Sequence, residues 1–442
     1  MNILTHKLAT TNDQLTSRGG LVAIAQVMES INLSERIDKY FPHPKSNRGF
    51  KPSTFIETLI LMQHEGGFHL DDVRYIQDDE ALRTLLGLDK IPQPSSLGNW
   101  LRRLGNDCQS FSAWTQVNKA ILKAALHRRK GITLDIDATE VVANKADAQW
   151  TYKKNKGYMP MVGHIAEIGQ IVVCDFRSGN ASPAKENLEF IQQCEHSLPD
   201  GCFVQSLRID AAGYQKKIIE YCDSKSIGYA IRAKSSAMLK AQIDALTEAE
   251  WAPLLNKKGN PITGQHTTRM AHWISDYEKP CTLVIQRKRL HGQVELDLES
   301  PCNSEEVCMG GYIYRAIATN QEAWSNTQII HWYNQRAEDS ENRIKELKLD
   351  FGGDTLPCSD FNANALYFLI AALSFNLFAL MRELLPEEMA HHRAITIRWR
   401  LYAMAAKVVK TSRQIFIKLK AKHHTLLEQV LLALRRFDSP PI

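Results

Sequence analysis

The sequence predicts a mixed α/β protein with a helical N-terminal region and a basic, helical C-terminal tail. Residues 20–128 carry apolar side chains at helical spacing, residues 131–320 mix β-like runs with helical stretches, and two long helical patterns follow residue 326. The chain has 442 residues, of which 44% are hydrophobic and 23% charged. These values are typical of a globular protein of two or three domains and exclude collagen-like and wholly disordered chains.

The helical region begins with two segments, 20–28 and 52–61, that combine helix-start residues with apolar spacing. Segment 95–104 is typical of a short basic helix that follows a Pro-Ser cap. The pattern changes at Gly131, because residues 132–137 alternate apolar and polar side chains as a strand does. Further strands are predicted at 162–168, 170–176, 206–209, 228–231 and 312–320, with helices at 187–194, 215–222 and 326–347. Short antiparallel strands are predicted at 268–275, 281–287 and 293–298.

The most apolar stretch, residues 365–381, contains Ser374 and Asn376. A membrane-spanning helix needs about 20 apolar residues, so we expect a buried core helix here. The first residues lack the apolar core of a signal peptide. Nine scattered cysteines without a CxxC pair indicate reduced thiols. We therefore expect a cytoplasmic protein.

Positive charge is concentrated at the C-terminus. Residues 391–442 contain eleven Lys or Arg and two acids, whereas the whole chain has a net charge of only +5. A basic tail on a near-neutral body favours contact with a polyanion, most simply nucleic acid. The alternative is a solvated amphipathic helix, since Ile415, Ile417 and Leu419 interleave with the charges.

Three acidic residues stand where an active site can form. Asp137 ends the first predicted strand, Asp210 follows the strand at 206–209, and Glu341 lies in the long polar helix. Acids at the carboxyl ends of strands gather at one edge of an α/β sheet. Three converging carboxylates repel one another unless cations neutralise them, and Mg²⁺ prefers such oxygen ligands. Two ions in such a site would suit phosphoryl transfer.

Each acid also has an ordinary structural explanation. An Asp at a strand end is often a turn former or a helix cap. Glu341 has Lys345 four residues on, which is a common helix-surface pair. Asp135 shares a strand face with Asp137, so it either approaches the same site or orients a neighbouring side chain.

The long polar helix carries residues that resemble a family signature, Tyr-x2-Arg-x3-Glu-x6-Lys. Tyr333 and Arg336 have the family spacing, and so do Glu341 and Lys348. Four residues separate Arg336 from Glu341, where the signature has three. Either a one-residue helical bulge absorbs the offset, or Arg336 has a different role. Glu341 is favoured as the acid by the surrounding Ser-Glu-Asn-Arg-Ile-Lys-Glu-Leu-Lys run, with Glu338 as the alternative.

Two further motifs complete the resemblance. Asp137-Ala138-Thr139 is similar to the first family motif, and Arg208 to Tyr214 is similar to the second. Tyr152, the run 156–160 and the run 177–180 also look familiar from this family. With these motifs the chain resembles a bacterial insertion-sequence transposase of the DDE class, in its cut-and-paste branch.

The resemblance implies a ribonuclease H-like catalytic domain at 129–235 and 310–390, interrupted by a mainly antiparallel β insertion at 236–309. It implies that residues 1–128 read the terminal inverted repeats, beside the basic tail at 391–442. Asp137, Asp210 and Glu341 would hold two Mg²⁺ or Mn²⁺ ions. The phosphate-gripping side chains would be Tyr333, Arg336, Lys348 and, as a weaker candidate, Lys345.

The implied partners are DNA, namely element ends and target, and a second copy of the chain on paired ends, near a bacterial nucleoid. Trp273 in the insertion would stack on a flipped base, although a strand-packing role is the simpler explanation. The alternatives are a metal-dependent nuclease, an inactive DNA-binding derivative, and a protein without a role on DNA.

Overall fold

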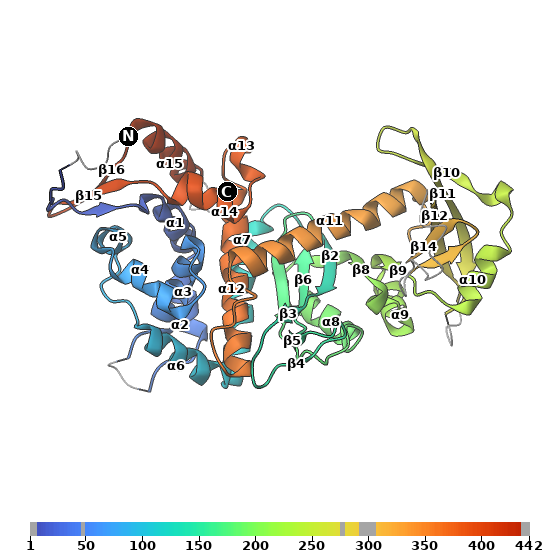
Figure 1. The fold of residues 1–442 in the computed structure, drawn as a ribbon, viewed down its shortest axis with the longest axis horizontal. Coiled ribbons are helices and arrows are strands. Elements are labelled where there is room, and N and C mark those ends of the chain that lie inside the picture. Colours follow the sequence, from blue (N-terminus) through green and yellow to red (C-terminus); the bar gives the residue numbers. More distant parts are fainter. Residues whose placement is uncertain (1–6, 46–48, 275–278, 291–305, 435–442) are drawn as a thin grey trace. The chain divides into compact units, whose positions relative to one another are not determined.

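The computed structural model describes residues 7–45, 49–274, 279–290 and 306–434, without the side chains of residues 337–339. The chain forms two compact units (Figure 1). Unit 1 comprises Met1–Ala124 and Glu346–Ile442, and unit 2 comprises Ala125–Lys345.

Unit 1 is mainly helical, as predicted for its N-terminal part. Its N-terminal helices are α1 (Val22–Ser30), α2 (Leu33–Tyr40), α3 (Pro52–Glu65), α4 (Arg74–Gln77), α5 (Glu80–Leu86), α6 (Pro94–Gly105) and α7 (Cys108–Ala125). Its C-terminal helices are α12 (Phe361–Arg382), α13 (Glu387–Ala390), α14 (Ala394–Ile397), a π-helical turn (Arg398–Tyr402) and α15 (Ala421–Leu434).

The predicted core helix is confirmed as α12. Among the described residues it is the one helix long and apolar enough to cross a membrane, but its most apolar window is wholly buried inside the protein. Its two polar residues are satisfied there, since the Ser374 hydroxyl donates to Gln63 Oε1 at 2.6 Å and Asn376 Nδ2 donates to Asn118 Oδ1 at 2.7 Å. Because α12 packs against α1, α3 and α6, residues 346–390 group with the helical unit and not with the predicted catalytic domain.

The prediction of an entirely helical basic tail was wrong. Residues Ala406–Lys410 form β15 and Ile415–Lys418 form β16, which pair with β1 (Leu15–Thr16) in the order β1-β15-β16. The alternation of Ile415 and Ile417 with polar residues has the period of a strand, and β-branched side chains favour one. The parts of the described tail that are helical as expected are α14, the π-helical turn and α15.

Unit 2 contains a ten-stranded sheet in the order β10-β11-β12-β14-β9-β8-β2-β6-β7, with β13 beside β14. The strands are β2 (Gly131–Ala138), β6 (Met161–Ile165), β7 (Ile171–Asp175), β8 (Phe203–Ile209), β9 (Gly228–Arg232), β10 (Ala252–Leu255), β11 (Pro261–His272), β12 (Cys281–Arg289), β13 (Val307–Met309) and β14 (Tyr312–Thr319). Its helices are α8 (Asn187–Ser197), α9 (Lys216–Lys225), α10 (Ala237–Asp244) and most of α11 (Asn326–Asp350).

Strand direction changes along this sheet. The strands β2, β6 and β7 are antiparallel neighbours, while β8 is parallel to β2 and β9 is parallel to β8. Helices α8 and α9 connect the parallel strands, and α11 runs along the sheet in Figure 1. Strands of the predicted β insertion are antiparallel and continue the same sheet, because β14 pairs with both β12 and β9. The strand predicted at 293–298 lies outside the described residues.

The cysteines follow the prediction with one exception. Seven described cysteines are free thiols. Cys308 is disulfide-bonded, so the expectation that every thiol is reduced was wrong for this residue.

Candidate active site

Asp137 and Asp210 lie at the same end of two neighbouring parallel strands. In the β2–β8 pair, Ile136 is in register with Ile209, so each aspartate is the next residue along its strand. Neighbouring strands are about 4.8 Å apart, so this register brings both carboxylates to one edge of the sheet. Asp210 also caps a 3₁₀ turn, because its Oδ1 accepts from the Ala212 amide at 2.9 Å.

Glu341 lies on an exposed side of α11, within the electrostatic reach of Asp137. The pKa of Asp137 is raised to about 6, chiefly because the carboxyl is buried. Arg336 opposes this rise in pKa, and the negative charges of Asp210 and Glu341 add to it. Asp137 therefore interacts electrostatically with both of the other predicted acids. No group of three acidic, imidazole or thiol side chains among the described residues is arranged to hold a metal ion.

Arg336 is turned into the protein toward the first of these acids. Its Nη2 lies 3.3 Å from Asp137 Oδ1 and donates to the Ile136 carbonyl at 3.1 Å. The residue is only 7% exposed. The helix is α-helical throughout and contains no bulge, so the extra residue before Glu341 places the two side chains about 140° apart. This geometry favours a different role for Arg336, as a counter-ion of Asp137.

Asp135 is separated from the site by its own ion pair. Its carboxylate is fully buried and accepts from Arg208 Nε and Nη2, each at 2.7 Å. His164 Nε2 lies 3.6 Å from the same carboxylate, and burial lowers the pKa of this imidazole well below its usual value. Of the two aspartates on β2, Asp137 is the one that solvent reaches, because its side chain is 22% exposed. Asp135 thus organises neighbouring side chains.

Polar contacts fasten α11 to the sheet. Arg208 Nη1 donates to the Trp332 carbonyl, and Ser340 Oγ lies 3.2 Å from His164 Nε2. Arg343 donates to the carbonyl oxygens of Ile165 at 3.0 Å and Ala166 at 2.8 Å. These contacts fix the height and rotation of the helix that carries Glu341.

Sequence reasoning missed the part that His164, Arg208 and Arg343 play in this fastening. Parallel pairing of Asp135 with Arg208 and antiparallel pairing with His164 bring these polar side chains together. The signal was a buried Asp with basic residues on both neighbouring strands, which becomes visible only once the strand register is known.

The remaining predicted site residues lie in different surroundings. Tyr333 is 7% exposed and packs in an apolar cluster with Ile317, Ile329 and Ile330, under the Arg232 guanidinium at 5.6 Å. Burial of both Tyr333 and Arg336 leaves neither side chain on a surface that a phosphate could reach in this structure.

Lys345 is exposed on α11, and Lys348 is half-buried in unit 1. Trp273 is 52% exposed just beyond β11, so it is not a packed strand residue. The side chain of Glu338, the alternative acid, lies outside the described residues.

Comparison with known proteins agrees with the resemblance. The family described as Transposase DDE domain group 1 matches residues 7–439. A piggyBac transposase synaptic complex with hairpin DNA, determined by cryo-electron microscopy, is similar with a TM-score of 0.43 and 12% sequence identity, over 96% of this chain and 82% of that chain. A search of curated proteins finds no match. Because the family match covers almost the entire sequence, the chain belongs to the DDE transposases, in the family Transposase DDE domain group 1.

Proposed function

We propose that this transposase cuts DNA at the ends of a bacterial insertion sequence and joins the freed 3′-hydroxyl to target DNA. Asp137, Asp210 and Glu341 are the catalytic carboxylates in this proposal. The observation that carries it is the placement of two aspartates at the ends of adjacent parallel strands, with the charge of Glu341 acting on Asp137.

The strand order supports a ribonuclease H-like core. In our assignment the core consists of three antiparallel strands, β2, β6 and β7, followed by β8 and β9, which run parallel to β2. A sheet of this kind presents its strand ends as a binding edge.

The donor types suit hard divalent cations, which would draw the three carboxylates together, since no group of three among the described residues is already arranged around an ion. All three side chains offer carboxylate oxygens, and a cation would offset both the burial and the neighbouring negative charges that raise the pKa of Asp137. Two Mg²⁺ or Mn²⁺ ions held by Asp137, Asp210 and Glu341 would activate the attacking group and stabilise the leaving oxygen of a phosphodiester.

Other side chains of the protein adjust the charge and the position of the proposed catalytic carboxylates. Arg336 lowers the pKa of Asp137 against the effect of burial, and so favours its charged form. Asp135 and Arg208 hold β2, β8 and α11 in register. Lys345 and Lys348 remain our candidates for phosphate contacts, and a second copy of the chain would bring the two DNA ends together.

The test uses labelled linear DNA that carries the element's ends, incubated with Mg²⁺ or Mn²⁺ and either wild type, Asp137→Asn, Asp210→Asn or Glu341→Gln. We expect the wild type to cut at the ends and to join them to target, and each variant to lose at least about 100-fold in rate, which corresponds to about 2.7 kcal/mol of barrier. The matched control is Glu322→Gln, which alters an exposed acid of unit 2 and should cut normally.

Three outcomes would contradict the proposal or part of it. Cutting without joining would indicate a nuclease. Tight end binding without cutting would indicate an inactive DNA-binding derivative. Normal cutting by Glu341→Gln would mean that another acid, with Glu338 next in line, completes the site.

A further inference from the structure

A small three-stranded sheet follows directly after β2. It consists of β3 (Val141–Val142), β4 (Gln149–Trp150) and β5 (Lys156–Tyr158), in the order β3-β5-β4. We call residues 139–160 the lobe. The Thr139 amide donates to the Pro160 carbonyl at 2.9 Å and closes the lobe at its base, two residues beyond Asp137. The lobe therefore projects from the carboxyl edge of β2 that carries the proposed active site.

Both acidic side chains of the lobe are used inside it. Glu140 accepts from the Thr151 hydroxyl and from Asn155 Nδ2, the latter at 3.1 Å. Asp147 Oδ1 accepts from the Tyr158 hydroxyl at 2.5 Å. Both carboxylates of the lobe therefore form hydrogen bonds that stabilise its own fold.

The lobe is fixed against the segment that follows β7. The Met159 amide donates to the Arg177 carbonyl at 3.0 Å, and Tyr158 forms a β-bridge with Ser178. A Cβ on Gly179 would lie 2.3 Å from the carbonyl oxygens of both Gln149 and Gly157. Only glycine allows this close approach. The runs 156–160 and 177–180 therefore meet in one rigid structure.

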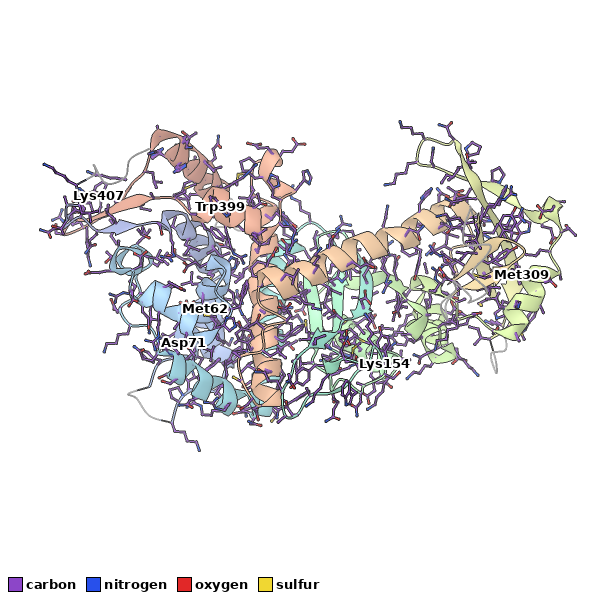
Figure 2. All side chains as sticks on the ribbon, viewed as in Figure 1. Met62, Asp71, Lys154, Met309, Trp399 and Lys407 are labelled. Carbon is purple, nitrogen blue, oxygen red and sulfur yellow. The ribbon has the colours of Figure 1, made fainter. Side chains whose placement is uncertain are left out.

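Aromatic and basic side chains point away from this scaffold. Trp150 is 67% exposed and Tyr152 is 63% exposed, on either side of the buried Thr151. Trp150 ends β4 and Tyr152 lies in the turn over residues 151–154 that leads into β5, where the Lys154 amide donates to the Thr151 carbonyl at 3.0 Å, so both exposed rings lie at the same end of the hairpin. Lys153 Nζ lies 5.7 Å from the centre of the Tyr152 ring, and Lys154, labelled in Figure 2, is also exposed.

The charge of this surface is positive. Within residues 139–160, all of which the structure describes, the four lysines at 145, 153, 154 and 156 form no ion pair. A surface for a protein partner would have few lysines, because lysine is depleted at such interfaces. Exposed aromatic rings among lysines are instead the combination that binds strands of nucleic acid, by stacking on bases and by contacting phosphates.

We propose that the lobe binds the DNA strand beside the phosphodiester that is cut, with Trp150 and Tyr152 stacked on bases unpaired at the DNA end. This inference rests on the proposed function. The strand β4 lies two strand spacings, about 10 Å, from β3, which begins four residues after Asp137. Since nucleotides follow one another at about 3.4 Å along a strand, the rings meet bases within a few nucleotides of the reacting phosphate.

The test measures binding of the full chain to fluorescein-labelled DNA by anisotropy, in EDTA so that no cutting occurs. The probes are a duplex with a four-nucleotide single-stranded end and the same duplex with a blunt end. Trp150→Ala and Tyr152→Ala should each weaken binding to the first probe about 5- to 100-fold and affect the blunt probe less. The control, Phe203→Ala, removes an exposed aromatic ring at the opposite end of β8 from Asp210 and should bind as wild type does.

A second variant tests the charges without touching the rings. Lys153→Gln/Lys154→Gln should reduce the slope of log affinity against log salt by about 1.4, because each phosphate contact to a single strand contributes about 0.7. All variants change exposed side chains, so their thermal unfolding midpoints should match that of the wild type.

The proposal is overturned if the double variant Trp150→Ala/Tyr152→Ala binds both probes with the wild-type affinity. It is also overturned if this variant differs from wild type only in the association of the chain with a second copy. Failure of the lobe and failure of the proposed function can be told apart. If the wild type cuts DNA in a way that depends on Asp137, and the lobe variants bind DNA as the wild type does, then only the proposal for the lobe is rejected. If DNA binding depends on the lobe but the wild type does not cut DNA, then only the proposed catalytic function is rejected.

Discussion

At the scale of single residues, each unit contains buried ionisable side chains whose charge state depends on their neighbours. Asp135 and Arg208 neutralise each other completely inside unit 2, and replacing one partner would leave a buried charge, which costs about 3–5 kcal/mol. In unit 1, His64 is fully buried, with Nδ1 3.0 Å from the Tyr402 hydroxyl and Nε2 3.1 Å from the Ser374 carbonyl. Burial, assisted by Arg398, lowers the pKa of His64 to about 3. The ring is therefore neutral in the folded protein at ordinary pH.

This shift predicts a pH dependence of stability. Between pH 6.5 and 3 the unfolded chain binds a proton at His64 that the folded protein does not bind, so the free energy of unfolding falls as the pH drops through this window. The contribution is about 1.4 kcal/mol per pH unit and vanishes above pH 6.5. His64→Gln should show a flatter loss of unfolding free energy in urea titrations between pH 6.5 and 4.5 than wild type does. His391→Gln, at an exposed position, should follow wild type. Parallel curves for all three proteins would refute the assignment.

At the scale of elements, α11 is the part that completes the site. Its exposed side presents Glu341, while its inner side is held by Arg208, Arg336, Ser340 and Arg343. A glutamate on an exposed helix face has no rigid surroundings of its own, so its position depends on how firmly the helix is attached.

Loosening this attachment should reduce the rate of DNA cutting more than the affinity for DNA. Arg343→Gln removes donors to the Ile165 and Ala166 carbonyls and should lower the single-turnover rate about 10- to 100-fold, because small displacements of catalytic groups are costly. Asn342→Ala, an exposed neighbour on the same helix, is the matched control. An Arg343→Gln variant that cuts at the wild-type rate would show that the attachment does not control the site.

At the scale of the whole molecule, charge is separated along the chain. Residues 391–442 carry eleven basic and two acidic residues. Four of these bases lie on β15, β16 and the start of α15, and Lys410 and Lys420 are exposed. Lys407, labelled in Figure 2, pairs with Asp13 at 2.6 Å and is less available.

The exposed lysines should contribute a salt-dependent share of duplex binding. Lys410→Gln/Lys420→Gln should lower the slope of log affinity against log salt by about 1.8 on duplex DNA of any sequence, because each phosphate contact contributes about 0.9. Lys225→Gln/Lys240→Gln removes two exposed lysines of α9 and α10 in unit 2 and should leave the slope unchanged. Equal slopes for all three proteins would mean that the tail does not touch DNA.

The sequence by itself determined most of the elements and the family. Periodicity located α1, α3 and α6 among the N-terminal helices, then α8, α9, α11 and α12, because burial of one face imposes a repeat on local sequence. It also located most strands of the sheet, but not the short strands β10 and β13. Ordered motifs identified a DDE transposase, as the family match confirms. The tail strands were missed because the alternation of apolar and charged residues there is short and lies among helix-forming lysines. Such a short run does not distinguish the repeat of a helix from that of a strand.

Only the tertiary structure decided how the acidic residues are used. Asp135 and Asp137 share a strand face by periodicity and only the family motif favoured Asp137, whereas in the structure the neighbouring strands supply Arg208 and His164 to Asp135 and not to Asp137. Arg336 was expected to contact a phosphate, with a different role as the alternative, and it is buried against Asp137, about 140° around α11 from Glu341. The exposed lobe was also hidden from the sequence. Its shape comes from carboxylates and a glycine that meet across distant segments, and long-range contacts of this kind leave no periodic trace in the chain.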